Sequence, residues 1–176
     1  MFFASAIFLG AAHYAAYSCH QTSGTVTQIG AAEVTALHLT DGCKTAQDFP
    51  PLDISILKHG ETGECRNATI GENVFLAGYP DGPEDEVRRG VVVLEDVTLK
   101  VQNRANRKVD RVGISVMMAP DVRPGYSGGP AISVDDGRVV GIILGVGPVR
   151  TDGFRAVIVQ PVETICNSIV ATKKAP

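Results

Sequence analysis

Short apolar or alternating segments recur along the chain, with turn-forming residues between them. The segments cover residues 5–9, 24–29, 33–40, 53–58, 73–78, 90–102, 112–118, 130–134, 138–146 and 154–160. The runs that separate them, such as YPDGPEDE, DDG and RTDG, carry the Gly, Asp and Pro that tight turns require. About ten strands at this spacing predict an antiparallel all-β sandwich or barrel.

The last sixteen residues, 161–176, break this pattern and predict a short helix. Their apolar residues share one helical face, and two lysines follow where the helix dipole favours cations. These residues are Val162, Ile165, Ile169 and Val170, followed by Lys173 and Lys174.

The acidic segment GYPDGPEDE near the midpoint of the 176 residues is the best candidate for a connection between two halves. We therefore expect an N-terminal lobe over 1–82 and a C-terminal lobe over 83–176, each long enough for a small closed barrel. A chain of this size needs no metal or disulfide to form a core.

Charge and hydropathy exclude two classes of partner. The net charge of -3 argues against nucleic-acid binding, and no uniform apolar run reaches the ~20 residues of a transmembrane helix.

The apolar N-terminus has the length of a signal peptide but lacks Lys and Arg in its first 17 residues, so a retained strand is favoured. The cellular location stays open between secreted, periplasmic and cytoplasmic.

The four cysteines, Cys19, Cys43, Cys65 and Cys166, have no C-x-x-C spacing, so we expect no metal site and no cofactor. Their even number allows two disulfides. The segment NAT at 67–69 has the form of a glycosylation sequon.

The stretch PGYSGGPAIS places Ser127 in a glycine-rich turn, where it is a candidate nucleophile. A serine hydroxyl needs an adjacent base held by a third group. All four histidines precede Ser127, and Pro130 with a strand-like run follows it, which excludes an α/β-hydrolase elbow. The order His, Asp, Ser is available: His13 follows the first apolar run, and Asp53 starts a strand where burial would suit an orienting carboxylate.

Three segments together, AAHYAA, DISILK and GYSGGP, resemble the trypsin-like serine proteases of the chymotrypsin fold in the order of that family. The resemblance implies two antiparallel β-barrels, with the triad in the groove between them, and a polypeptide substrate. It assigns Ser127 as nucleophile, His13 as base and Asp53 as the orienting acid. The backbone N–H groups of Gly125 and Ser127 would form the oxyanion hole.

The same resemblance suggests substrate contacts. Asp121 stands where members that cut after Arg or Lys carry an acid, and VVGIILGVG resembles the strand along the substrate cleft. That strand contributes Leu144, Gly145 and Val146, where the valine would narrow the pocket mouth.

The chain departs from the family at two points. Tyr126 replaces the aspartate of trypsinogen-style activation, which we therefore do not expect. Few residues precede His13, so the first barrel is expected to be incomplete, and a catalytically silent binding module is the alternative function. Of the other histidines, His38 is expected as a strand side chain, His59 in an exposed turn, and His20 as a reserve base.

Overall fold

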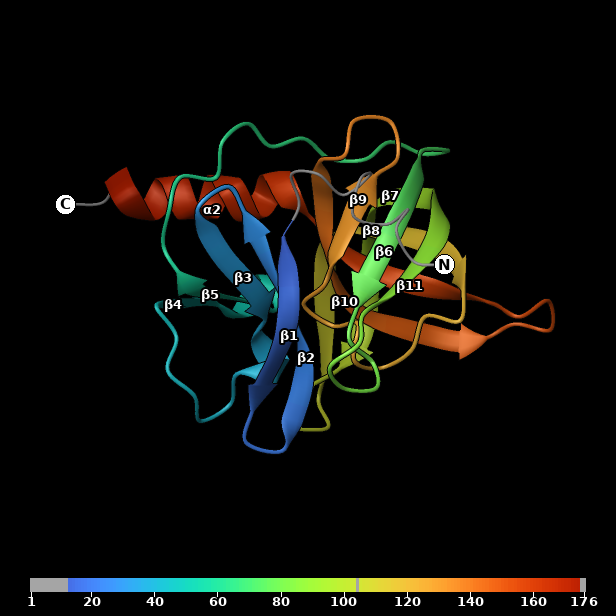
Figure 1. Cartoon of the computed structure of the whole chain (residues 1–176), viewed down its shortest axis with the longest axis horizontal. Helices are drawn as coiled ribbons and strands as arrows, with labels where there is room; N and C mark the ends of the chain where they lie inside the picture. Colours follow the sequence, from blue (N-terminus) through green and yellow to red (C-terminus); the bar gives the residue numbers. More distant parts are fainter. Residues whose placement is uncertain (1–12, 104, 175–176) are drawn as a thin grey trace.

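The computed structural model describes residues 13–103 and 105–174 and places their strands in two groups, which Figure 1 shows side by side. The strand expected at 5–9 lies outside the described residues. The first group contains β1 (Tyr14–Cys19), β2 (Thr22–Ile29), β3 (Ala32–Ala36), β4 (Gln47–Phe49) and β5 (Ile54–Lys58). Two short 3₁₀ helices, η1 (Leu37–Leu39) and η2 (Pro50–Leu52), lie at the ends of its strands.

The second group closes into a barrel with the strand order β10-β11-β8-β7-β6-β9. Its strands are β6 (Asn73–Gly78), β7 (Glu86–Gln102), β8 (Lys108–Pro120), β9 (Pro130–Ser133), β10 (Val139–Val149) and β11 (Phe154–Pro161). Every pairing is antiparallel. The prediction of an all-β fold with a C-terminal helix is confirmed.

The first lobe departs from a closed barrel over its described residues. Its described strands form a five-stranded sheet in the order β1-β2-β3-β5-β4, with β1 and β4 at the two edges. The boundary between the lobes also lies earlier than expected. Strand β6, inside the range 1–82, pairs with β7 and β9 of the barrel, so the change of lobe falls between Lys58 and Asn73.

The C-terminal helix α2 (Val162–Lys174) confirms the predicted helix and contributes to the core of the first lobe. In Figure 1 it runs across one end of the first group of strands. Its buried residues Val162, Ile165, Cys166 and Ile169 share one cluster with Val34, Ile54 and Ile56 of the sheet. Val170, expected on this face, is 44% exposed.

Two disulfides use all four cysteines, and no free cysteine is left in the described chain. Cys65–Cys166 ties the segment between the lobes to α2. Close to it, Asn67 Oδ1 accepts the backbone N–H of Glu163 at 3.0 Å and so caps α2. The amide of the sequon is therefore engaged in the fold.

Candidate active site

Asp53 stands at the end of a short proline-rich turn. Pro50 and Pro51 preset the backbone of η2, and the Asp53 N–H closes the turn on the Pro50 carbonyl at 3.1 Å. Asp53 itself has φ 55, in the left-handed region that non-glycine residues rarely adopt. Such conformations cost free energy and concentrate at functional sites.

The Asp53 carboxylate holds His38 at two points. Its Oδ2 accepts a hydrogen bond from the imidazole Nδ1 at 2.7 Å, and its Oδ1 accepts the backbone N–H of His38 at 3.0 Å. The Asp53 side chain is only 13% exposed, whereas that of His38 is 33% exposed. Since a carboxylate accepts only, the Nδ1 of His38 carries the proton, and in the neutral ring Nε2 is left as the acceptor.

The expectation that His38 is an ordinary strand residue is therefore wrong. His38 lies in η1, directly after β3, and the Leu37 N–H donates to the Asp53 carbonyl at 2.8 Å. The turn of η1 and the turn of η2 are thus joined by backbone and side-chain bonds, which fix the imidazole against the acid.

The structure does not bring His13 to Asp53, so the sequence assignment of His13 as base is corrected here. The His13 carbonyl accepts the N–H of Gln28, which pairs with Glu33 at one end of β3. Asp53 and His38 lie at the opposite end of β3, beyond the pair Ala36–Ile54. Among the described residues no hydrogen bond joins the His13 side chain to Asp53 or Ser127. The segment around His13 resembles the family pattern, but the structure places His13 next to Gln28.

Ser127 lies in a tight loop between β8 and β9. Its Oγ donates to the Leu144 carbonyl of β10 at 3.2 Å, and Leu144 lines the same cavity as His38 and Asp53. Gly128 has φ +84, and a Cβ on it would lie 1.9 Å from the Thr25 carbonyl oxygen. Only glycine fits there, which is the physical reason for a glycine after the serine.

Buried threonines of β2, in the first lobe, hold the Ser127 loop in place by hydrogen bonds. Thr27 Oγ1 donates to the Gly128 carbonyl at 2.8 Å, and Thr25 Oγ1 donates to the Gly125 carbonyl at 3.0 Å. The Thr25 N–H also donates to the Ser127 carbonyl at 2.9 Å. Strand β2 therefore joins the nucleophile loop of one lobe to the sheet that carries His38.

The two backbone amides expected to form the oxyanion hole, those of Gly125 and Ser127, lie on either side of the buried residue Tyr126. In the described chain, neither the Gly125 N–H nor the Ser127 N–H donates a hydrogen bond. Tyr126 between them is fully buried, and its OH donates to Glu86 Oε2 at 3.1 Å. Burial raises the pKa of Tyr126, so it remains a neutral donor. The hydrogen bond from Arg123 holds the pKa of Glu86 below its usual value.

A cavity of about 870 Å³ opens beside this constellation. Of the predicted substrate contacts, Leu144, Gly145 and Val146 line it together with His38 and Asp53. Asp121 does not line this cavity, and its side chain is exposed.

A basic side chain lies next to Asp121. Arg155 Nε donates to the Gly147 carbonyl at 2.7 Å, and its Nη1 donates to the Val122 carbonyl at 3.0 Å. A guanidinium thus bridges β10 and the loop of Ser127. A preference for Arg or Lys substrates, suggested by Asp121, gains no support from this arrangement.

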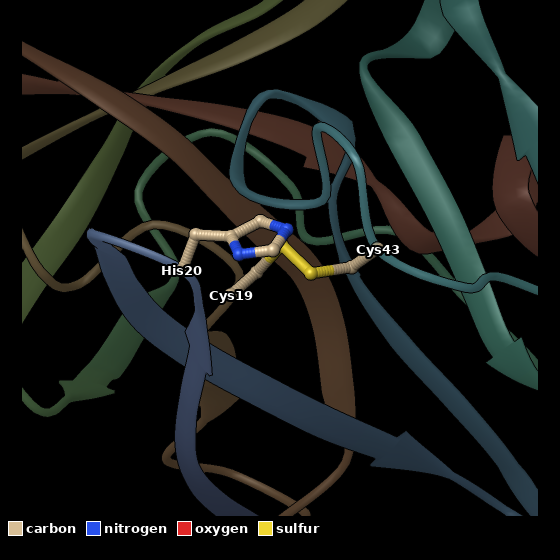
Figure 2. A group of neighbouring side chains, drawn as sticks. All are labelled: Cys19, His20 and Cys43. Carbon is tan, nitrogen blue, oxygen red and sulfur yellow. A yellow bond between two sulfur atoms is a disulfide. The ribbon is translucent and has the colours of Figure 1, made fainter.

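One group of side chains has metal-ligating atoms close together, but it is not a metal site. Figure 2 shows Cys19, His20 and Cys43 side by side, with the two sulfur atoms joined in a disulfide. A thiolate is the form that ligates zinc, and an oxidised cysteine has none to offer. His20 Nε2 instead lies 3.4 Å from the Gly42 carbonyl and takes no part in the contact between His38 and Asp53.

Sequence reasoning missed His38 and the buried threonines. One signal was present: the pattern VTALHLT places a histidine among small and apolar residues, followed by a polar threonine. Thr40 Oγ1 does bond Leu37 O and Ser55 Oγ within the same turn.

The family of the chain follows from comparison with known proteins. The model of the trypsin-like peptidase domain matches residues 11–142, well over half of the chain. The chain therefore belongs to this family and is a trypsin-like protease of the chymotrypsin fold, that is, a hydrolase of peptide bonds. A comparison with curated protein sequences found no match.

Solved structures agree on the fold. The active form of the Rv3671c protease from M. tuberculosis aligns with a TM-score of 0.72 at 18% identity, covering 94% of this chain and 82% of that one. The MamO protease domain from Magnetospirillum magneticum aligns at 0.65 with 16% identity, covering 92% and 96%. The HtrA-type protease AlgW, solved with a decapeptide, aligns at 0.58 with 18% identity, covering 85% and 52%.

No helix in the described residues is long and apolar enough to span a bilayer.

Proposed function

We propose that this chain is a serine endopeptidase whose triad is Ser127, His38 and Asp53. The observation that supports this most directly is the two-point contact between the Asp53 carboxylate and His38. It orients the imidazole and fixes the proton on Nδ1, which are the two tasks of the acid in a Ser-His-Asp triad.

In the proposed reaction, the Ser127 hydroxyl turns its hydrogen from the Leu144 carbonyl toward His38 Nε2. His38 takes the proton as Oγ bonds to the peptide carbonyl carbon, and Asp53 stabilises the imidazolium. His38 then gives the proton to the leaving amine as the C–N bond breaks, which leaves an acyl-enzyme on Ser127. Water, deprotonated by His38, hydrolyses the ester and restores the serine.

The N–H groups of Gly125 and Ser127 serve this reaction as oxyanion donors. The Gly125 carbonyl accepts a hydrogen bond from Thr25 Oγ1 of the first lobe, and the OH of the buried Tyr126 is bonded to Glu86. These contacts hold the loop in place. Donors fixed before the reaction need no reorganisation when charge develops on the carbonyl oxygen. Loss of one such donor typically costs about 3 kcal/mol in the transition state.

A fluorophosphonate probe tests the proposal, because it reacts only with an activated serine. We expect the wild type and His13→Ala to be labelled, and Ser127→Ala and His38→Ala to remain unlabelled. Folded wild-type protein that fails to react would contradict the proposal and favour a catalytically silent binding module.

A further inference from the structure

The long hairpin formed by β7 and β8 belongs to the barrel but reaches across to the first lobe. Val97 and Leu99 of β7 pack against a core cluster that joins first-lobe residues such as Val34 and Ile54 to Ile114, Ile142 and Leu144 of the barrel. Beyond Leu99, residues 101–103 and Arg111 line the cavity that contains His38 and Asp53. The hairpin is therefore a wall of the candidate active site, supplied by the lobe that carries the serine.

Arg111 makes a polar contact between this wall and the proline turn that precedes Asp53. Its Nη1 donates to the Pro50 carbonyl at 2.6 Å and to the Pro51 carbonyl at 3.1 Å. The Pro50 carbonyl also accepts the Asp53 N–H. The Pro50 carbonyl oxygen therefore accepts two hydrogen bonds. One comes from the Asp53 N–H and closes the turn, and the other comes from Arg111 of the opposite lobe.

Asp53 is bonded to Leu37 and His38, but the proline segment before it has few hydrogen bonds of its own. Pro50 and Pro51 have no N–H to donate, and both are exposed. The strand before them, β4, has only three residues and lies at a sheet edge. At its end, Asp53 keeps a left-handed backbone conformation that persists only where the surroundings enforce it.

We propose that Arg111 is a positioning residue: from the second lobe it fixes the η2 turn, and thereby Asp53 and the imidazole of His38. This inference rests on the triad proposed above. A charged donor suits the task, because one terminal nitrogen of the guanidinium, Nη1, bonds both carbonyls at once. The contact also joins the lobe of the nucleophile to that of the acid and base.

The experiment compares Arg111→Met and Arg111→Lys with the matched control Lys108→Met. Lys108 lies on the same strand, is exposed, and its side chain has no hydrogen bond or ion pair in the described structure. A loosened triad impairs the chemical step more than substrate binding, and small misplacements of catalytic groups cost up to about 10²-fold. We expect kcat to fall about 10- to 100-fold in Arg111→Met with KM changed less than about twofold, a smaller loss in Arg111→Lys, and no loss in Lys108→Met.

A second readout does not need turnover. In a Ser127→Ala background, the Nδ1 proton of His38 should give a low-field ¹H resonance, because its bond to Asp53 protects it from exchange. We expect this resonance to broaden or vanish in Arg111→Met, to recover in part in Arg111→Lys, and to persist in Lys108→Met.

Two results would overturn the inference. A rise in KM at unchanged kcat would show that Arg111 binds substrate instead. An unchanged Nδ1 resonance in folded Arg111→Met would show that the turn keeps its place without the guanidinium. The resonance decides this even if the chain proves to have no peptidase activity, so the failure of one proposal is distinguishable from the failure of the other.

Discussion

His38 and Asp53 lie fifteen residues apart in the chain, and the carboxylate of one accepts both the ring N–H and the backbone N–H of the other, at 2.7 and 3.0 Å. Two contacts on one carboxylate restrict the imidazole in position and in rotation. This pairing, and not the nearest match to a family motif, decides which of the four histidines is the candidate base.

Alanine substitutions of His38 and His13 test which of the two histidines is the catalytic base. We expect His38→Ala to lower kcat by about 10⁶, as removal of the base does in subtilisin, and His13→Ala to change it less than about twofold. The measurement is steady-state cleavage of an unstructured protein substrate. His38→Ala combined with Ser127→Ala should lose little more than either alone, whereas additive losses would show that the residues do not act as a unit.

Replacement of the acid tests its role in setting the tautomer. Asn at position 53 keeps the shape of Asp but can present an N–H to Nδ1, which places the proton on the wrong ring nitrogen. We expect Asp53→Asn to lower kcat about 10⁴-fold while the protein stays folded. Near-UV circular dichroism checks the fold, and an active Asp53→Asn variant would remove Asp53 from the mechanism.

The support of the serine loop should depend on pH through Glu86. Its pKa is lowered in the folded chain, first by the hydrogen bond from Arg123. A carboxyl with a lowered folded pKa stabilises the fold above its unfolded value, about 4.3, and this contribution disappears as pH falls through the folded value. The Tm difference between wild type and Glu86→Gln should therefore be largest near neutral pH and shrink below about pH 4.

Glu84→Gln is the matched control for the pH dependence expected of Glu86→Gln. Glu84 is exposed, and its side chain has no hydrogen bond or ion pair in the described residues, so Glu84→Gln should leave the Tm profile of the wild type unchanged between neutral and acid pH. A Tm difference for Glu86→Gln that is constant with pH would contradict the role of its charge.

The two disulfides should contribute unequally to stability. Cys65–Cys166 spans 101 residues and Cys19–Cys43 spans 24. In the chain-entropy description a longer closed loop restricts the unfolded state more, about 5 against about 3 kcal/mol for these lengths. Urea unfolding of the paired Cys→Ser variants measures this, and a larger loss for the shorter loop would contradict the expectation.

Patterning along the chain predicted most of the strands, because an alternating or apolar run bounded by turn residues reports local burial directly, but it predicted neither β1 (Tyr14–Cys19) nor β4 (Gln47–Phe49). It also singled out Ser127 and Asp53 as candidates, since the loop of the first requires glycines and the second directly precedes β5. It failed at His38 because VTALHLT alternates like a strand, while η1 forms only where Leu37 and His38 meet Asp53.

By itself, the sequence determined an antiparallel β protein with a terminal helix, a serine in a turn that only glycines allow, and an acid at a strand start. The tertiary structure alone decided which histidine meets that acid, which lobe β6 joins, and where the C-terminal helix packs. The reason is physical: local patterns record how each residue is buried, whereas a hydrogen bond between distant residues depends on strand register and on how two lobes are joined.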